Sequence, residues 1–167
     1  VNTLPEILYW AKRMSEQKII PEMEIFDLSM IGTARRLIAE GLAKPVMALA
    51  VGFENALQAN QHNLDLMFAC MRTLPGSVVG LCQHSMKNFD LFRYALKQGA
   101  DVVRVGFEDG QTLDNGTIAS TNLELVNDSL RIIRELGLAV ATPAPALQLL
   151  GIPRDSKSVS AARHRRN

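Results

Sequence analysis

Two patterns of apolar positions take turns along the chain. Short apolar runs, typical of strands, alternate with stretches in which apolar residues recur at helical spacing. The predicted strands cover residues 22–27, 45–51, 77–82 and 102–108. The predicted helices cover residues 4–14, 31–40, 60–74, 88–98 and 121–136, with a shorter helix after Pro143. This alternation predicts an α/β protein built from right-handed βαβ units around a parallel sheet, and four such units are half of an eight-stranded barrel.

The fourth predicted strand carries charged residues that a buried strand does not usually keep. Side chains alternate faces along a strand at about 3.3 Å per residue, so Arg104, Gly106 and Glu108 are predicted to share one face, with the two charges about 6–7 Å apart. Asp109 follows at the carboxyl end, where ligands bind in open α/β sheets and in (β/α) barrels. We therefore predict a charged site here. The alternative is an internal ion pair between Arg104 and Glu108.

Composition and charge exclude several partners. The 167 residues include 47% hydrophobic ones, enough for one core, and the net charge of +1 with 5% aromatic residues predicts neither a nucleic-acid partner nor a membrane partner. Cys70 and Cys82 fit neither a metal-ligand spacing nor a disulfide framework. They are predicted to be small buried residues of a reducing compartment, so the expected location is the cytoplasm.

The first residues of the chain are predicted to be neither a signal peptide nor a membrane span. Residues 1–5 lack the basic and apolar regions of a signal peptide, and the chain starts with Val1 rather than methionine, which suggests a piece of a longer protein. Residues 1–152 are predicted to form one domain. Residues 153–167 are expected to be a flexible basic tail.

Several motifs together resemble the C-terminal half of the β-keto acid cleavage enzymes, although each alone is weak. In chain order they are Pro21-Glu22-x-Glu24-Ile25-Phe26-Asp27, Leu74-Pro75, Arg104-Val105-Gly106-Phe107-Glu108-Asp109, Asn122-x-Glu124-Leu125-Val126, Ala141-Thr142-Pro143 and Leu150-Gly151-Ile152. The resemblance covers nearly the whole chain up to Pro153. It implies a (β/α)₈ TIM-type barrel of which this chain supplies about four βα units. It further implies Zn²⁺ as cofactor and the condensation of a β-keto acid with acetyl-CoA, giving acetoacetate and a new CoA ester.

The resemblance also implies roles for single residues. Glu108 falls on the zinc-ligating glutamate of the family, Arg104 on an arginine required for catalysis, and Asp109 on the aspartate proposed as the base. An earlier glutamate also belongs to that site, and either Glu22 or Glu24 matches it. We favour Glu24 because it lies nearer the carboxyl end of its strand.

Some family features are missing from the chain. Ser29 stands where glycine is expected, Gly110 where asparagine is common, and the segment after Gly52 lacks the usual Pro-Ala-Thr-Pro. The family's His-x-His zinc ligands are absent as well, since the histidines are His62, His84 and His164. Catalytic zinc usually has three protein ligands, so the chain by itself is expected to bind zinc weakly.

The three histidines and the predicted sheet leave further possibilities open. His62 is predicted to lie on a helix surface, whereas His84, just after the third strand, is a weaker candidate for contact with substrate or CoA. A second hypothesis is a complete, non-catalytic α/β domain whose Arg104 binds a small anion. A third is a half-barrel whose open strand edges pair with another copy, so that a homo-oligomer is expected.

Overall fold

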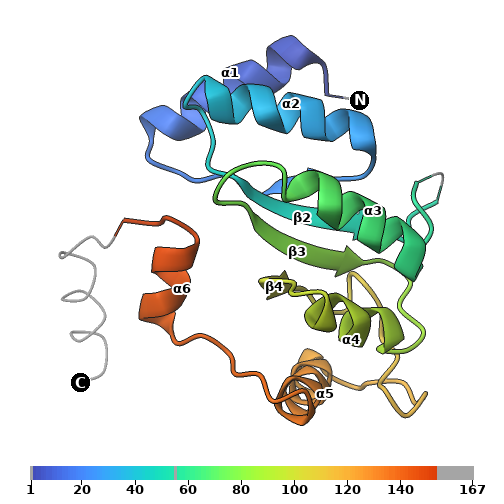
Figure 1. The fold of residues 1–167 in the computed structure, drawn as a ribbon. Helices are drawn as coiled ribbons and strands as arrows, with labels where there is room; N and C mark the ends of the chain where they lie inside the picture. Colours follow the sequence, from blue (N-terminus) through green and yellow to red (C-terminus); the bar gives the residue numbers. More distant parts are fainter. Residues whose placement is uncertain (1, 55, 154–167) are drawn as a thin grey trace.

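The computed structural model describes residues 2–54 and 56–153 and shows four strands that alternate with helices (Figure 1). The strands are β1 (Met23–Ile25), β2 (Val46–Val51), β3 (Val78–Gln83) and β4 (Val102–Val103). The helices are α1 (Leu4–Glu16), α2 (Leu28–Ala39), α3 (Gln61–Met71), α4 (Asp90–Lys97), α5 (Asn122–Glu135) and α6 (Pro143–Leu149). Each predicted element is therefore present, and the bounds differ most at the fourth strand.

All strand pairs in the sheet are parallel, in the order β1-β2-β3-β4. The pairing aligns Glu24 with Ala48, Ala48 with Gly80, and Gly80 with Val102, so these four residues form one row across the sheet. Sequential parallel neighbours joined by helices are the arrangement of a (β/α) barrel segment, which confirms the predicted fold class. Within the described residues, β1 and β4 each lack a neighbour on one side and form the two edges.

One face of the sheet carries the larger apolar side chains and is covered by helices α2, α3 and α4 (Figure 1). Met47, Leu49 and Val51 of β2 alternate onto this face and are at most 1% exposed. Their helical neighbours in the core include Ile31, Ala34, Leu64, Met67, Phe68, Met71, Leu91 and Ala95. Burial of such side chains stabilises the fold by about 1.5–3 kcal/mol each for the large ones, so this core holds the strands in register.

The opposite face of the sheet carries small side chains in its middle. The residues that alternate onto this face are Ala48, Ala50, Gly80 and Cys82. Ala48 and Gly80 lie in the same row as Glu24 of β1 and Val102 of β4. A Cβ atom on Gly80 would lie 3.1 Å from the Val102 carbonyl oxygen and 3.2 Å from the Val102 Cβ, so a larger residue does not fit there without movement. The small residues leave space for longer polar side chains that extend from the two edge strands.

The fourth strand is shorter than the sequence predicted. It ends at Val103, and a turn over residues 106–110 follows, in which the Gly106 carbonyl oxygen accepts hydrogen bonds from the amides of Asp109 (2.9 Å) and Gly110 (3.0 Å). The prediction that Arg104 and Glu108 share a strand face is therefore wrong, because Glu108 lies in the turn. The turn also brings Asp109 back toward Arg104, which a continued strand would have prevented.

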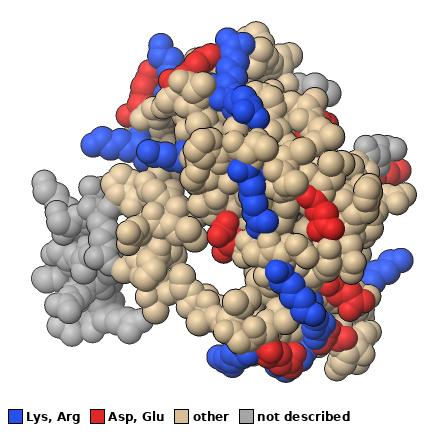
Figure 2. Space-filling view, in the orientation of Figure 1, with Lys and Arg blue, Asp and Glu red and all other residues tan. Residues whose placement is uncertain are grey.

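The chain leaves α5 in an extended segment and reaches α6 at the end of the sheet where the strands begin (Figure 1). In the space-filling view an opening separates this segment from the rest of the protein (Figure 2). No side chain of α6 is buried. The predicted basic tail lies outside the described residues except for Pro153. Among the described helices, none is both long and apolar enough to span a bilayer.

Candidate active site

Arg104 is the centre of a charged cluster at the carboxyl end of the sheet. Its Nε donates to Asp109 Oδ2 at 2.9 Å and its Nη2 donates to Asp109 Oδ1 at 2.6 Å, a bidentate ion pair. Its Nη1 donates to Glu24 Oε1 on β1 at 3.3 Å. Its Nη2 also lies 3.5 Å from Glu108 Oε2. The Arg104 side chain thus joins the two edge strands across the small residues of β2 and β3.

The three carboxylates around Arg104 differ in exposure. The Asp109 side chain is 3% exposed, whereas those of Glu24 and Glu108 are 45% and 84% exposed. Arg104 itself is 40% exposed. Asp109 is therefore placed to hold the guanidinium in position, while Glu24 and Glu108 are open to a ligand.

Hydrogen bonds to Asp109 raise the pKa of Arg104 above its ordinary value, so the guanidinium stays charged at any physiological pH. Cys82 lies beneath this pair, 1% exposed, with its Sγ 3.5 Å from Asp109 Oδ1. Burial, together with the nearby Asp109 carboxylate, raises the pKa of Cys82 to about 12. The thiol is therefore neutral and donates a weak hydrogen bond to Asp109.

The structure brings together all four residues that the sequence put forward for this site, namely Arg104, Asp109, Glu24 and Glu108. Glu24, not Glu22, contacts Arg104, and no ion pair of Glu22 exists within the described part of the chain. The alternative prediction was an internal ion pair between Arg104 and Glu108. The structure does contain an ion pair of Arg104 with a buried carboxylate, but this carboxylate belongs to Asp109 rather than Glu108.

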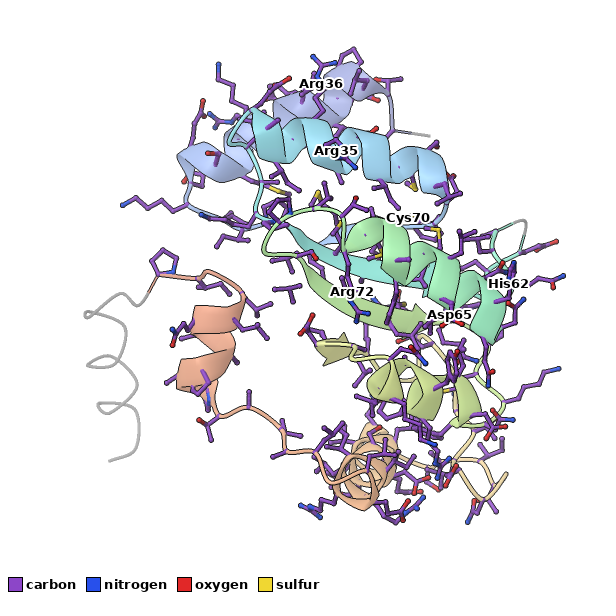
Figure 3. All side chains as sticks on the ribbon, viewed as in Figure 1. Arg35, Arg36, His62, Asp65, Cys70 and Arg72 are labelled. Atoms are coloured by element: carbon purple, nitrogen blue, oxygen red, sulfur yellow. The ribbon has the colours of Figure 1, made fainter. Side chains whose placement is uncertain are left out.

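Neither of the two described histidines forms a hydrogen bond or ion pair with the Arg104 cluster. His62 is exposed at the start of α3, as predicted (Figure 3). His84, just after β3, is half-buried, and its ring stacks on Phe53 with centroids 4.5 Å apart. Neither belongs to a group of three or more His, Cys, Asp or Glu side chains that could hold a metal ion, and residues 2–54 and 56–153 contain no such group.

The loop that carries Glu108 and Asp109 is fixed to its surroundings at both ends. The Phe107 amide donates to Asn122 Oδ1 at 2.9 Å, and the Met86 amide donates to the Asp109 carbonyl oxygen at 3.3 Å. Gly110 packs so closely on Met86 that a Cβ there would lie 3.0 Å from the Met86 carbonyl oxygen. A residue with a side chain at this position, such as asparagine, would therefore require Met86 to move by a few tenths of an ångström.

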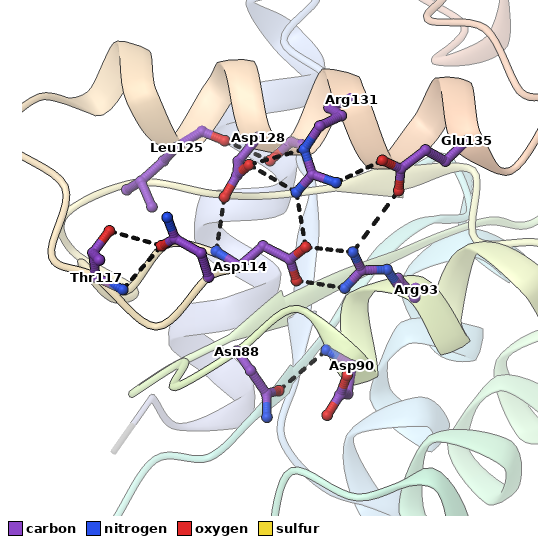
Figure 4. Close-up of polar contacts among 11 residues, drawn as sticks. Asn88, Asp90, Arg93, Asp114, Thr117, Leu125, Asp128, Arg131 and Glu135 are labelled. Atoms are coloured by element: carbon purple, nitrogen blue, oxygen red, sulfur yellow. Dashed lines mark hydrogen bonds and ion pairs between the residues drawn. The ribbon is translucent and has the colours of Figure 1, made fainter.

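Further along the same loop, Asp114 joins it to α4 and α5 through ion pairs (Figure 4). Arg93 binds both Asp114 oxygens, Arg131 Nη2 lies 2.7 Å from Oδ2, and the Asp114 amide donates to Asp128 at 2.7 Å. Hydrogen bonds from Arg93 lower the pKa of Asp114 to about 2. No pattern in the sequence predicted this network, because its members are far apart in the chain and each is a common surface residue.

Replacement of Asp114 by asparagine is expected to lower the free energy of unfolding by about 1–2 kcal/mol at pH 6. The pKa of Asp114 is lowered on folding from 3.8 to about 2, so its contribution is complete above pH 4 and is lost as the pH falls toward 2. Urea unfolding of both proteins at pH 6 and pH 3 measures this. The difference between them should shrink at pH 3, whereas a constant difference would contradict the assignment, and Glu22→Gln serves as the control.

Comparison with known proteins gives a consistent picture. A family model described as beta-keto acid cleavage enzyme matches residues 1–152. The 3-keto-5-aminohexanoate cleavage enzymes of Fusobacterium nucleatum and Acetoanaerobium sticklandii are 35% and 34% identical to this chain, over 91% of it and 55% of each relative. The 3-oxoadipate:acetyl-CoA acetyltransferase of Cupriavidus necator is 32% identical, over 89% of this chain and 54% of the relative. The chain thus spans about half the length of these relatives.

Solved structures match the fold. ObcA in a ternary complex with a C4-CoA adduct and oxalate aligns with a TM-score of 0.70 at 18% identity, over 90% of this chain and 41% of ObcA. ObcA in its apo form aligns with a TM-score of 0.67. Both matches cover less than half of ObcA, which agrees with a partial (β/α)₈ barrel.

Proposed function

This chain belongs to the beta-keto acid cleavage enzyme family, and we propose that it carries the carboxylate-binding side of an acetyl-CoA-dependent β-keto acid cleavage site. The observation that carries the proposal is Arg104, a partly exposed guanidinium held by buried Asp109 and flanked by Glu24 and Glu108. In the reaction, the bond between C2 and C3 of the β-keto acid breaks. C2, with its carboxylate, joins the acetyl group to give acetoacetate, and the remaining acyl group takes the CoA sulfur.

Arg104 is proposed to bind the substrate carboxylate through the part of its guanidinium that Asp109 leaves open. Nε and one hydrogen of Nη2 are taken by Asp109, whereas Nη1 makes only a 3.3 Å contact with Glu24. Arginine has five N–H donors in a fixed plane, so Nη1 can donate to a substrate carboxylate while Nε and Nη2 still donate to Asp109. The small residues Ala48, Ala50 and Gly80 give a bound substrate room beside it.

Removal of a C2 proton starts the carbon–carbon bond change, and a carboxylate of this cluster is proposed to accept it. Asp109 remains the residue that the resemblance implies for this role. Its 3% exposure and its bidentate pair with Arg104 favour a second candidate, Glu24, which is 45% exposed and touches the open side of Arg104. Both residues, with Arg104, make up the proposed catalytic group.

A zinc ion at this site would need ligands from beyond the described residues, with Glu108 as the ligand from this chain. Glu108 is 84% exposed and therefore accessible. A single carboxylate does not make a zinc site, and the described residues offer no group of three possible ligands. The residues described here thus do not fit zinc by themselves, and we assign no step of the reaction to it.

The open edges of the sheet support the proposed association of the chain with further strands. β1 and β4 have unpaired sides in the described part of the chain, and parallel strands are rarely left exposed. A second copy of the chain, as in a homo-oligomer, or a further part of a longer polypeptide would satisfy these edges. A closed site would then surround the Arg104 cluster.

The proposal is tested with the full-length protein. Purified protein is incubated with acetyl-CoA and with 3-keto-5-aminohexanoate or 3-oxoadipate, and CoA esters are analysed by mass spectrometry. We expect a new acyl-CoA whose acyl group is the β-keto acid shortened by its C1 and C2. Stoichiometric binding of the acid without any new CoA ester would instead support a non-catalytic domain that binds small anions.

A further inference from the structure

The turn over residues 106–110 presents two residues of the proposed site, so its backbone position decides where both carboxylates lie. The Gly106 carbonyl oxygen accepts the amides of Asp109 and Gly110 and thereby closes the turn upon itself. These two bonds fix the internal shape of the turn. They do not fix where the turn sits relative to the sheet and to α5.

A side chain from α5 supplies one of the connections of the turn to its surroundings, in addition to the bond from the Met86 amide to the Asp109 carbonyl oxygen at 3.3 Å. Asn122 Oδ1 accepts the Phe107 amide at 2.9 Å, directly before Glu108 in the chain. The Asn122 side chain also lies close to Gly106, where a Cβ atom would be in ordinary van der Waals contact with the same Oδ1 atom at 3.6 Å. The bond therefore links the first residue of α5 to the turn, across 15 residues of sequence.

Asn122 is not needed to cap its own helix. The N-cap of α5 is Thr121, whose side chain accepts the Glu124 amide, while the Glu124 carboxylate accepts from the Ser120 amide at 3.2 Å. These interactions satisfy amides at the start of α5 without Asn122. The side chain of Asn122 is thus free to hold the turn, and its removal leaves the cap intact.

We infer that Asn122 is a positioning residue of the β-keto acid site, which acts through the turn on Glu108 and Asp109. The inference rests on the proposed function. Loss of the bond leaves the turn held through Asp109, by Arg104 and by the Met86 amide, and frees its Phe107 side, which precedes Glu108. A shift of about 1 Å in a catalytic group can lower activity about 10²-fold. Asn122 itself touches neither Arg104 nor the two carboxylates through any hydrogen bond of the described structure.

The test uses three variants of the complete polypeptide. Asn122→Ala removes the acceptor, and alanine is well tolerated at the first position of a helix. Asn122→Asp keeps an acceptor oxygen at the same distance along the side chain and suits a helix N-terminus. Asn127→Ala, at an exposed position of the same helix, makes the identical change away from the turn. For each variant kcat, KM, the melting temperature and the exchange rate of the Phe107 amide hydrogen are measured.

We expect Asn122→Ala to lower kcat/KM by about 10–100-fold and to speed exchange of the Phe107 amide, with little change in melting temperature. Asn122→Asp should restore both values to within about threefold of the wild type, and Asn127→Ala should change neither. Wild-type kcat/KM in Asn122→Ala, or a loss that aspartate does not restore, would overturn the inference. If the wild type itself has no cleavage activity, the proposed function fails, and unchanged exchange of the Phe107 amide in Asn122→Ala would independently show that Asn122 does not hold the turn.

Discussion

Replacement of Arg104 by lysine is expected to lower kcat/KM for β-keto acid cleavage by about 10²-fold or more, although the charge is kept. Lysine presents a single ammonium group and cannot bind both oxygens of Asp109 while it reaches toward Glu24 and a substrate carboxylate. In the structure one guanidinium serves Asp109 through Nε and Nη2 and leaves Nη1 on the open side. The loss should appear in both KM and kcat, because the substrate carboxylate is bound less tightly and less precisely.

A matched arginine elsewhere separates this effect from a general intolerance of lysine. Arg36 on α2 pairs with Glu40 at 2.7 Å and is half exposed, so Arg36→Lys should leave kcat, KM and the melting temperature unchanged. Equal activity of Arg104→Lys and the wild type would show that the bidentate guanidinium of Arg104 is not needed to bind the substrate. Steady-state kinetics of the three proteins under one set of conditions gives the comparison.

Asp109 and Glu108 are neighbours in one turn, yet their replacement is expected to change the free energy of unfolding by very different amounts. Asp109→Asn should lower the free energy of unfolding by about 2–4 kcal/mol, because a nearly buried carboxylate that accepts two hydrogen bonds from Arg104 is lost. Glu108→Gln changes a side chain that is 84% exposed and should alter it by less than about 0.5 kcal/mol. Urea unfolding of the two variants measures the contrast.

Activity adds a second contrast between these variants. Asp109→Asn should also slow turnover by about 10²–10⁴-fold if Asp109 is the base, the usual range for that role. A slow but stable Asp109→Asn protein would favour the role of base over that of a support for Arg104. Similar unfolding free energies for both variants would contradict the burial that the structure gives to Asp109.

Much of the fold follows from the sequence, because apolar periodicity decides which side chains reach the core. The continuous apolar run at β2 predicted a strand buried on both faces, and all six of its residues are buried. The start of α2 was predicted later in the chain than it occurs. Asp27 explains the difference, since its side chain accepts the amides of Ser29 and Met30 and starts the helix at Leu28.

The candidate site was only partly predictable. Arg104, Asp109 and Glu24 stood out because charged residues interrupt or end apolar strands, and the structure places them in contact. The turn that follows Val103 was missed, because strand alternation was extended over residues whose backbone bonds close a turn on Gly106. The contact between the Cys82 thiol and the Asp109 carboxylate was also missed, since a cysteine in an apolar run does not indicate that a carboxylate packs on it.

Asn122 shows a further limit of sequence reasoning. Its place beside a Thr121 N-cap is ordinary for a helix start, and only the three-dimensional structure shows the Phe107 amide at 2.9 Å from its side chain. Contacts between segments far apart in sequence depend on how the loop between β4 and α5 folds. The Asp114 ion pairs hold that loop, and no local pattern in the sequence predicts them.

The proposed activity is an exchange of acyl groups between a β-keto acid and CoA at the Arg104 cluster. The most direct measurement traces carbon in the complete polypeptide, with acetyl-CoA labelled with ¹³C at both acetyl carbons and an unlabelled β-keto acid. We expect acetoacetate labelled at C3 and C4, an unlabelled new acyl-CoA, and loss of both products in Arg104→Lys. Unlabelled acetoacetate, or labelled acetoacetate formed equally well by Arg104→Lys, would contradict this expectation.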